Sequence, residues 1–424
     1  MNPGFSSIGK NSKDLPISWL MEKALANPAM ASLAAGFTDN DTLPVDLTRS
    51  AISDIFGDPE KAKRSLQYGT TRGHQKLRNL ILKNLVENDS ALDSLDQNSI
   101  VISHGSQEFL YQFCELMLDP GDIVVVEDPT YFVMLGLFYS LGVEVIGVPL
   151  NNDGVDIERL KDLLHGLSKE GKIQRLKFFY GVTYFQNPTG ISSASRNKLE
   201  VLELLKKHES QAGHQLYYLE DAAYLNLSFD QDVEKTALTF HEHKDRVVFT
   251  STFSKPYSTG LRVGYGILPR QLVDPLLFIK TNHDFGTSNF LQFILAEVIS
   301  SGKFDSHLEI IQKRYAYKCD LLDSSLKSHF PAWAKWGKPI GGLYIWVTLP
   351  DSFDTSLNTS FFDLALQNEV LYVPGSLCFA KSSLAGEGGR RYKATMRLTF
   401  GGASEQAITL GAERLGRVLE AMNG

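Results

Sequence analysis

The sequence has 424 residues, of which 43% are hydrophobic and 21% are charged, which is typical of a globular protein long enough for more than one domain. Its formal net charge of −7 disfavours nucleic acid and anionic membranes as partners, and no uncharged stretch reaches the length of a membrane-spanning helix. Residues 1–13 lack the pattern of a signal peptide, and Cys114, Cys319 and Cys378 are too far apart for a metal motif, so a cytoplasmic location and no metal are expected.

From about residue 99 onward, short apolar runs alternate with amphipathic segments. This alternation predicts βαβ units and a mainly parallel sheet. The predicted strands are Ile100–Ser103, Ile123–Glu127, Glu144–Pro149, Leu176–Tyr180, Gln215–Leu219, Val247–Ser251 and Val263–Leu268. The predicted helices between them are Glu108–Leu118, Ile157–His165, Ser195–His208 and Pro269–Lys280. The last strand follows its predecessor closely, which leaves its pairing open.

After Thr287 the pattern changes to that of a smaller α+β unit. Its predicted elements are helices at Asn289–Ser300, Phe304–His329, Ser360–Asn368 and Glu405–Met422, and strands at Gly342–Leu349, Val370–Val373 and Ala394–Phe400. One short helix, Ile17–Leu25, is expected near the N-terminus and is expected to pack on this unit, while Ser90–Asn98 resembles a polar linker. The sequence thus predicts an α/β protein with an N-terminal segment at 1–46, a large domain at 47–300 and a small domain at 301–424, the small domain using both chain ends.

Lys255 is the most informative polar residue, because it follows the predicted strand Val247–Ser251. A desolvated lysine amine forms a Schiff base with an aldehyde. The nearby hydroxyls of Thr252 and Ser254 and the guanidinium of Arg262 suit a phosphate. An aldehyde and a phosphate in one ligand describe pyridoxal 5'-phosphate (PLP). Solvated surface charges are the alternative interpretation of this segment alone.

Other polar groups also follow predicted parallel strands, at the edge where open α/β sheets bind ligands. Each group has a simpler explanation: a strand-to-helix turn for Ser106, a helix N-cap for Asp221, a tight turn for 187–190 and a core position for Tyr131. Together they match the parts of PLP. Ser106 and Gln107 suit the phosphate, Asp221 suits the pyridine nitrogen, Asn187 and Tyr224 suit the phenolic oxygen, and Tyr131 suits the ring face.

From about Gly36 to Phe400 the chain resembles the fold-type-I PLP enzymes of the class I/II aminotransferase family, above all the kynurenine/2-aminoadipate branch with broad specificity. The motifs that carry the resemblance are Tyr68-Gly69, Gly105-Ser106-Gln107, Pro120-Gly121-Asp122, Asp128-Pro129-Thr130-Tyr131, Phe185-Gln186-Asn187-Pro188-Thr189-Gly190, Glu220-Asp221, Ser254-Lys255, Arg262, Gly341-Gly342, Pro374-Gly375 and Arg397-Leu398. Four positions depart from the branch's usual residues: Thr183, Ala222, Thr259 and Ala394.

The resemblance implies a role for each residue. Lys255 would carry PLP and move the substrate proton, with Asp221 and Tyr131 beside it. The phosphate would be held by Ser106, Gln107, Thr252, Ser254 and Arg262, and by Tyr68 of a second subunit in a homodimer. Arg397 would clamp the substrate carboxylate, Asn187 would also contact the substrate, and Gly36 and Phe37 would lie near the substrate side chain.

The function that this implies is transamination between an L-amino acid and a 2-oxo acid by a ping-pong mechanism. The largely apolar and aromatic residues expected around the substrate favour aromatic or long aliphatic amino acids, whereas Arg390 or Arg391 would favour 2-oxoglutarate. Three alternatives stay open: another PLP reaction on the same fold, such as elimination, cyclisation, racemisation or decarboxylation; a PLP-binding transcription regulator; and a non-catalytic relative.

Overall fold

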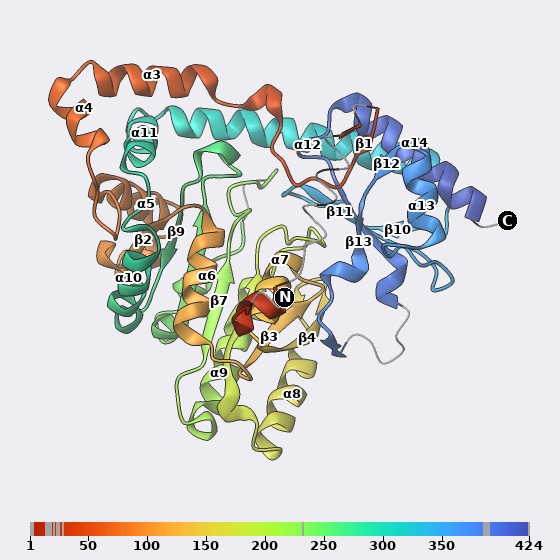
Figure 1. The fold of residues 1–424 in the computed structure, drawn as a ribbon, viewed down its shortest axis with the longest axis horizontal. Coiled ribbons are helices and arrows are strands. Elements are labelled where there is room, and N and C mark those ends of the chain that lie inside the picture. The colour runs from red at the N-terminus through yellow and green to blue at the C-terminus, as the bar shows by residue number, and fades with distance from the viewer. Residues whose placement is uncertain are drawn as a thin grey trace.

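The computed structural model describes residues 4–12, 19, 22, 26–27, 29–230, 233–384 and 391–422. A large sheet flanked by helices and a small antiparallel sheet organise these residues (Figure 1). Helix α12 (Lys303–His329) contacts α11 (Asn289–Ser300) near the large sheet and α14 (Glu405–Met422) near the small one. The predicted α/β fold with a second, smaller unit is confirmed, and the domain boundaries at 46/47 and 300/301 stay a prediction.

The large sheet runs in the order β14, β4, β3, β6, β7, β8, β9, β2, and β5 pairs with β4. Neighbours are parallel from β14 to β8, while β9 is antiparallel to both β8 and β2. The strands are β2 (Ile100–Ser103), β3 (Ile123–Asp128), β4 (Glu144–Asn151), β5 (Gly154–Val155), β6 (Leu176–Val182), β7 (Tyr217–Asp221), β8 (Val247–Thr252), β9 (Gly264–Ile267) and β14 (Ser382–Ser383). The carboxyl ends of β2, β3, β6, β7 and β8 therefore meet at one edge of the sheet.

Helices bury their apolar faces against this sheet and against each other. Helix α8 is an example: Asp156 caps its first turn by accepting from the Arg159 N–H at 3.1 Å, and Leu160, Leu164 and Leu167 are buried at helical spacing. The helices of this layer are α3 (Val45–Phe56), α4 (Pro59–Leu66), α5 (Gln75–Asn88), α6 (Ser106–Met117), α7 (Phe132–Ser140), α8 (Ile157–Lys169), α9 (Ser195–Ala212), α10 (Arg270–Asp284) and α11. Among the described residues, no helix is both long and apolar enough to cross a membrane.

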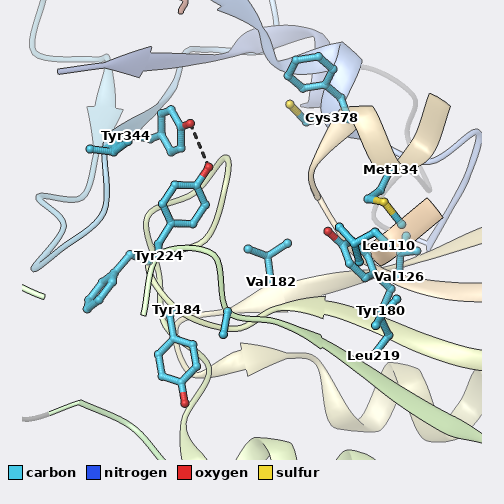
Figure 2. Packing of buried hydrophobic residues seen from close by; sticks show 14 of the residues in the cluster. Leu110, Val126, Met134, Tyr180, Val182, Tyr184, Leu219, Tyr224, Tyr344 and Cys378 are labelled. Atoms are coloured by element: carbon cyan, nitrogen blue, oxygen red, sulfur yellow. Dashed lines mark hydrogen bonds between the residues drawn. The ribbon is translucent and has the colours of Figure 1, made fainter. Parts of the chain in front are cut away.

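The core of the large sheet is rich in aromatic side chains. Figure 2 shows Tyr180 of β6 close to Val126, Met134 and Leu219, and each of these side chains is at most 1% exposed. All six residues of β3 are buried, as expected for a parallel strand covered on both faces. A rigid, fully covered sheet of this kind holds the side chains at its edge in fixed positions.

The small sheet has the order β10, β11, β15, β13, with every neighbouring pair antiparallel, and strand β1 pairs with β12 nearby. The elements of this unit are β1 (Ala31–Ser32), β10 (Lys335–Trp336), β11 (Tyr344–Thr348), β12 (Val370–Leu371), β13 (Val373–Pro374), β15 (Thr395–Thr399), α13 (Ser360–Gln367) and α14. The β1–β12 pair brings the N-terminal segment to this unit, and the Trp19 ring lies 5.9 Å from that of Phe362 on α13.

The structure differs from the sequence-based expectation at several places. Residues 47–98 contribute α4, α5 and most of α3, although no helix was predicted there. The apolar faces of these helices pack mainly against α11 rather than against the sheet. The expected linker 90–98 contains two short 3-10 turns over buried Leu92. Helix α1 (Ser7–Asn11) contacts α7 of the large unit. Most of the expected helix 17–25 lies outside the described residues.

Candidate active site

A cavity of about 470 Å³ opens at the carboxyl edge of the large sheet. Groups from the ends of the large-sheet strands form one wall, and residues of the small sheet and of the segment after β1 form another. The predicted site residues that line it are Gly36, Phe37, Ser106, Gln107, Tyr131, Asn187, Asp221, Tyr224, Thr252, Ser254, Lys255, Arg262 and Arg397. Tyr68 is the one predicted site residue outside this lining; its side chain is 82% exposed and lies edge-on to the Phe285 ring at 5.6 Å.

One end of the cavity is an anion cradle built from the first turn of α6 and the loop before β9. Helix α6 begins at Ser106, directly after Gly105, and its free N–H groups and dipole favour an anion. Arg262 donates from Nη1 to the Ser254 hydroxyl at 3.1 Å. Gly105 has a φ of +74°, and a Cβ there would stand 2.7 Å from Arg262 Nη2, so glycine keeps the cradle open.

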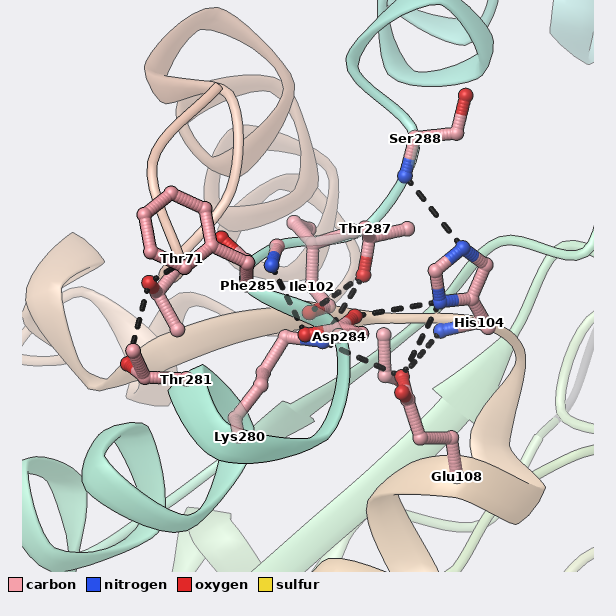
Figure 3. A network of polar contacts seen from close by, with 12 residues as sticks. Thr71, Ile102, His104, Glu108, Lys280, Thr281, Asp284, Phe285, Thr287 and Ser288 are labelled. Carbon is pink, nitrogen blue, oxygen red and sulfur yellow. Dashed lines mark hydrogen bonds and ion pairs between the residues drawn. The ribbon is translucent and has the colours of Figure 1, made fainter. Parts of the chain in front are cut away.

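A charged network lies directly behind this cradle (Figure 3). Lys280 Nζ lies 2.6 Å from Asp284 and 3.2 Å from Glu108, and the His104 ring lies 3.3 Å from Asp284. Hydrogen bonds that the imidazole donates to Asp284 and Glu108 raise the pKa of His104 to about 9, so the imidazole is cationic at neutral pH. The carbonyl of His104 accepts from Arg262 Nη2 at 3.4 Å, which links the network to the cradle. Although His104, Glu108 and Asp284 have metal-ligating groups close together, Lys280 supplies the cation among them.

Lys255 stands in the cavity wall after β8, where the loop at Ser254 turns away from the sheet. Its Nζ donates to the Gly36 carbonyl at 2.8 Å. Burial lowers the pKa of the amine, and the nearby cations Arg397 and Arg262 lower it further. An amine that loses its proton readily is a nucleophile and a base, so this position suits both covalent and proton-transfer chemistry.

Asp221 ends β7 and is 3% exposed. Burial raises the pKa of its carboxyl to about 6, although Tyr180 donates to Oδ2 at 2.9 Å and the Ala223 N–H donates to Oδ1 at 3.1 Å. Both donors are neutral, so a cationic ligand beside Asp221 would relieve the cost of the buried charge. The next residue, Ala222, is 0% exposed, and its N–H donates to the Thr250 carbonyl of β8 at 2.8 Å.

Buried carboxylates fix the loop that presents Asn187. Glu127 accepts from the Val182 N–H at 2.9 Å and from Gln186 Nε2 at 2.8 Å, and burial raises its pKa to about 7. The hydroxyl of Thr183 donates to Glu220 at 3.0 Å, a contact that the usual proline would not make. Thr183 therefore fixes the start of the loop through this additional hydrogen bond.

Arg397 enters the cavity from β15 and is 2% exposed. Its Nη1 donates to Asn187 Oδ1 at 2.8 Å and its Nη2 donates to the Ala34 carbonyl at 2.7 Å. Within the described part of the chain, the buried Nε has no hydrogen-bond partner. A buried guanidinium with unused N–H groups is suited to bind a carboxylate.

Several cavity residues were missed by sequence reasoning. They are Phe132, Val133, Val182, Ala223, Thr259 and Tyr344. Tyr180, the partner of Asp221, was also missed because it is the last apolar residue of the predicted strand Leu176–Tyr180 and has the pattern of a core residue. The only sequence signal for Tyr344 was its closeness to the Gly341-Gly342 motif. The expectation for Arg390 or Arg391 concerns side chains outside the described part of the structure.

Comparisons with known proteins find similar sequences and a similar fold over nearly the whole chain. The family model described as aminotransferase class I and II matches residues 30–415. An aromatic-amino-acid aminotransferase 1 of Thermococcus litoralis is 31% identical, over 94% of this chain and 90% of its own. A 2-aminoadipate transaminase of Thermus thermophilus is 26% identical, over 98% and 97%. The crystal structure of Pyrococcus horikoshii kynurenine aminotransferase superposes with a TM-score of 0.89 at 30% identity, covering 99% of this chain and 98% of that one.

Proposed function

The chain belongs to the aminotransferase class I and II family, and from this premise we propose that it moves an amino group between an L-amino acid, preferably aromatic or long aliphatic, and a 2-oxo acid. The observation that best supports the proposal is the cavity itself, which Lys255, Asp221 and Arg397 all line. A reactive amine, a buried carboxylate and a guanidinium with unused N–H groups are the three groups that such a reaction needs from the protein.

The cofactor of this family is PLP, and the cavity suits it. The cradle at Gly105 and Arg262 takes an anion, and the buried carboxylate of Asp221 lacks a cation at the place where a pyridine nitrogen would fit. When bound, PLP supplies an aldehyde that reacts with amines and a ring that accepts electrons.

We assign the cofactor contacts as follows. Ser106, Gln107, Thr252, Ser254 and Arg262 hold the phosphate. Asp221 would keep a proton on the pyridine nitrogen, and Asn187 and Tyr224 would donate to the phenolic oxygen. Tyr131, which lines the cavity at the start of α7, covers the ring face.

Proton transfer is assigned to Lys255. Because burial lowers the pKa of its amine, Nζ is available as a base for the proton on the substrate Cα. Arg397 holds the substrate carboxylate with its unused N–H groups, and Asn187 keeps the guanidinium in place. By holding the carboxylate, this clamp would orient the substrate so that loss of the Cα proton is favoured over loss of carbon dioxide. The amino acid and the oxo acid then use the same clamp in turn, as a ping-pong mechanism requires.

The substrate preference is inferred from the remaining wall of the cavity. Phe37, Tyr131, Phe132, Val133 and Val182 present aromatic and aliphatic surface near Gly36. Such a wall gains free energy by covering an apolar side chain and gains nothing from a short dicarboxylic one. The aromatic-amino-acid aminotransferase among the relatives agrees with this preference.

We also propose a homodimer in which Tyr68 of one subunit reaches the phosphate in the other. Tyr68 is 82% exposed, and other large apolar side chains nearby in the sequence, including Val45, Phe56 and Leu66, are exposed as well. A second copy of the chain would cover this surface. The buried, free cysteines agree with the cytoplasmic location that we infer.

The proposal is tested by adding single amino acids, without oxo acid, to the PLP-loaded enzyme and recording its absorbance. A visible band that disappears with phenylalanine or leucine and returns with a 2-oxo acid is expected. Lys255→Ala is expected to abolish the response, whereas Lys303→Ala, at an exposed lysine at the start of α12, retains it.

Other results would change the assignment. Release of ammonia, carbon dioxide or a cyclised product without any need for an oxo acid would identify a different PLP reaction. Turnover of aspartate without turnover of phenylalanine or leucine would refute the substrate preference alone. Failure to develop a visible band with added PLP would refute the role of Lys255.

A further inference from the structure

Tyr344 lines the cavity and has no role in the assignments above. It lies in β11 opposite Thr399 of β15, so it shares a face of the small sheet with Arg397, two residues earlier on β15. Its side chain is 2% exposed. The small sheet therefore presents two neighbouring polar groups to the same cavity.

Neighbouring groups restrict the position of the Tyr344 hydroxyl. It lies 3.1 Å from the hydroxyl of Tyr224, the contact drawn as a dashed line in Figure 2. A Cβ on residue 36 would stand 2.5 Å from it, so Gly36 leaves the space that the hydroxyl occupies. The ring lies under the guanidinium of Arg397, whose central carbon is 4.3 Å from the ring centroid.

The hydrogen-bond donors and acceptors around Tyr224 show how the Tyr344 hydroxyl affects it. A tyrosine hydroxyl has one proton to donate and two lone pairs that accept. The Asn187 side chain donates from Nδ2 to Tyr224 at 3.4 Å, because an amide nitrogen only donates. If Tyr344 also donates, both lone pairs of Tyr224 are used and its proton is left for a third group in the cavity. If Tyr224 donated to Tyr344 instead, it would have no proton for a ligand.

We propose that Tyr344 is a positioning residue of this site: its hydroxyl donates to Tyr224 and so directs the Tyr224 proton to the phenolic oxygen of PLP. This inference rests on the proposed function, since it needs PLP in the cavity. Linked hydroxyls also polarise one another, which strengthens the donation from Tyr224. A second contribution is the Tyr344 ring, which supports the carboxylate clamp at Arg397.

The groups around Tyr344 fit this direction of donation. Tyr224 after β7 and Tyr131 before α7 both have pKa values raised, first of all by burial, so both keep their protons at neutral pH. Lys255 after β8 and Arg397 on β15 are the cationic or basic groups that face the same space. The Tyr224 oxygen, at 3.1 Å, is the hydrogen-bond partner of the Tyr344 hydroxyl.

The test is the pH midpoint of the visible absorption band of the PLP-loaded enzyme, measured without substrate. Donation to the phenolic oxygen stabilises the deprotonated form of the bound cofactor, so weaker donation makes the proton harder to remove. Tyr344→Phe is expected to move the midpoint upward by roughly 0.3 pH units. Tyr224→Phe is expected to move it further in the same direction. If Tyr344 acts through Tyr224, the double variant has the midpoint of Tyr224→Phe alone.

A matched control is Tyr372→Phe, which also removes a buried hydroxyl. Tyr372 is 0% exposed and donates to the Thr355 carbonyl at 2.8 Å in the small unit. The control is expected to lose stability without moving the midpoint. If Tyr344→Phe does not fold, Gly36→Ala gives a second route, because the added methyl group displaces the Tyr344 hydroxyl and is expected to raise the midpoint as well.

The outcomes separate this proposal from the proposed function. If the wild-type enzyme shows its visible band, an unchanged midpoint in Tyr344→Phe, or shifts that add in the double variant, would overturn the role of Tyr344. A wild-type enzyme with no visible band would refute the proposed function itself. A larger KM for amino acids in Tyr344→Leu than in Tyr344→Phe is expected, because only the leucine variant loses the ring under Arg397.

Discussion

Replacing Asp221 by asparagine separates the cost of a buried charge from its use in the active site. The carboxyl is 3% exposed, and burial raises its pKa to about 6. Asparagine replaces both hydrogen bonds: its oxygen accepts from the Ala223 N–H, and its amide nitrogen donates to the Tyr180 hydroxyl, which reverses the direction of that bond. The substitution therefore removes the charge and reverses one hydrogen bond.

The magnitude follows from the two pKa values. The unfolded chain holds this carboxyl near the ordinary value of 3.8, and folding raises it to about 6, so the folded chain binds the proton more tightly. The cost of the buried charge is therefore absent at low pH, grows as the pH rises through these values and is constant above them. It is about 1.6 kcal/mol at pH 5 and about 3 kcal/mol at pH 7. Asp221→Asn is expected to stabilise the cofactor-free chain by up to these amounts, less the cost of taking the acceptor from the buried Tyr180 hydroxyl.

Urea unfolding of the cofactor-free proteins at equal chain concentration, followed by tryptophan fluorescence, measures this difference. Adding PLP is expected to reverse the order, because only the wild type pairs a carboxylate with the protonated pyridine. Asp351→Asn, at an exposed turn, is the matched control and should leave stability unchanged. The reasoning is refuted if the cofactor-free variant is no more stable than the wild type at pH 7, or if its advantage is equal at pH 5 and pH 7.

Three further predictions concern the clamp, the cradle and the network behind it. Arg397→Lys is expected to raise the KM for phenylalanine about 100-fold, because lysine lacks the paired N–H groups and each charge-assisted hydrogen bond is worth about 1.5–3 kcal/mol; an unchanged KM in steady-state kinetics would contradict the clamp. Gly105→Ala is expected to weaken PLP binding about tenfold or more in an absorbance titration, since its methyl group meets Arg262 at 2.7 Å and φ is +74°. His104→Gln is expected to lower the melting temperature at pH 7 but not at pH 10. Asp284 raises the pKa of His104 from 6.5 to about 9, so the ion pair stabilises the fold fully below pH 6.5, and this stabilisation is lost as the pH rises through about 9. An equal loss at both pH values would contradict it.

The interior of the large sheet was predictable because its signal is local. A strand such as β3 is a run of apolar residues whose neighbours in sequence already indicate a buried strand, and the polar residues after it must then lie at the sheet edge. The positions of Asp221 and Lys255 after their strands were predicted in this way. The direction of β9 was not, because antiparallel pairing with β8 and β2 depends on how the chain returns.

The sequence by itself thus determined the alternation of strands and helices and which polar side chains stand at the strand ends, since both depend on residues a few positions apart. Only the tertiary structure decided which distant groups meet. Tyr224 and Tyr344 are 120 residues apart and Asn187 and Arg397 are 210 apart, yet each pair is hydrogen-bonded. These contacts exist because α12 and the packing of the small sheet bring β11 and β15 over the edge of the large one, and no local pattern records that approach.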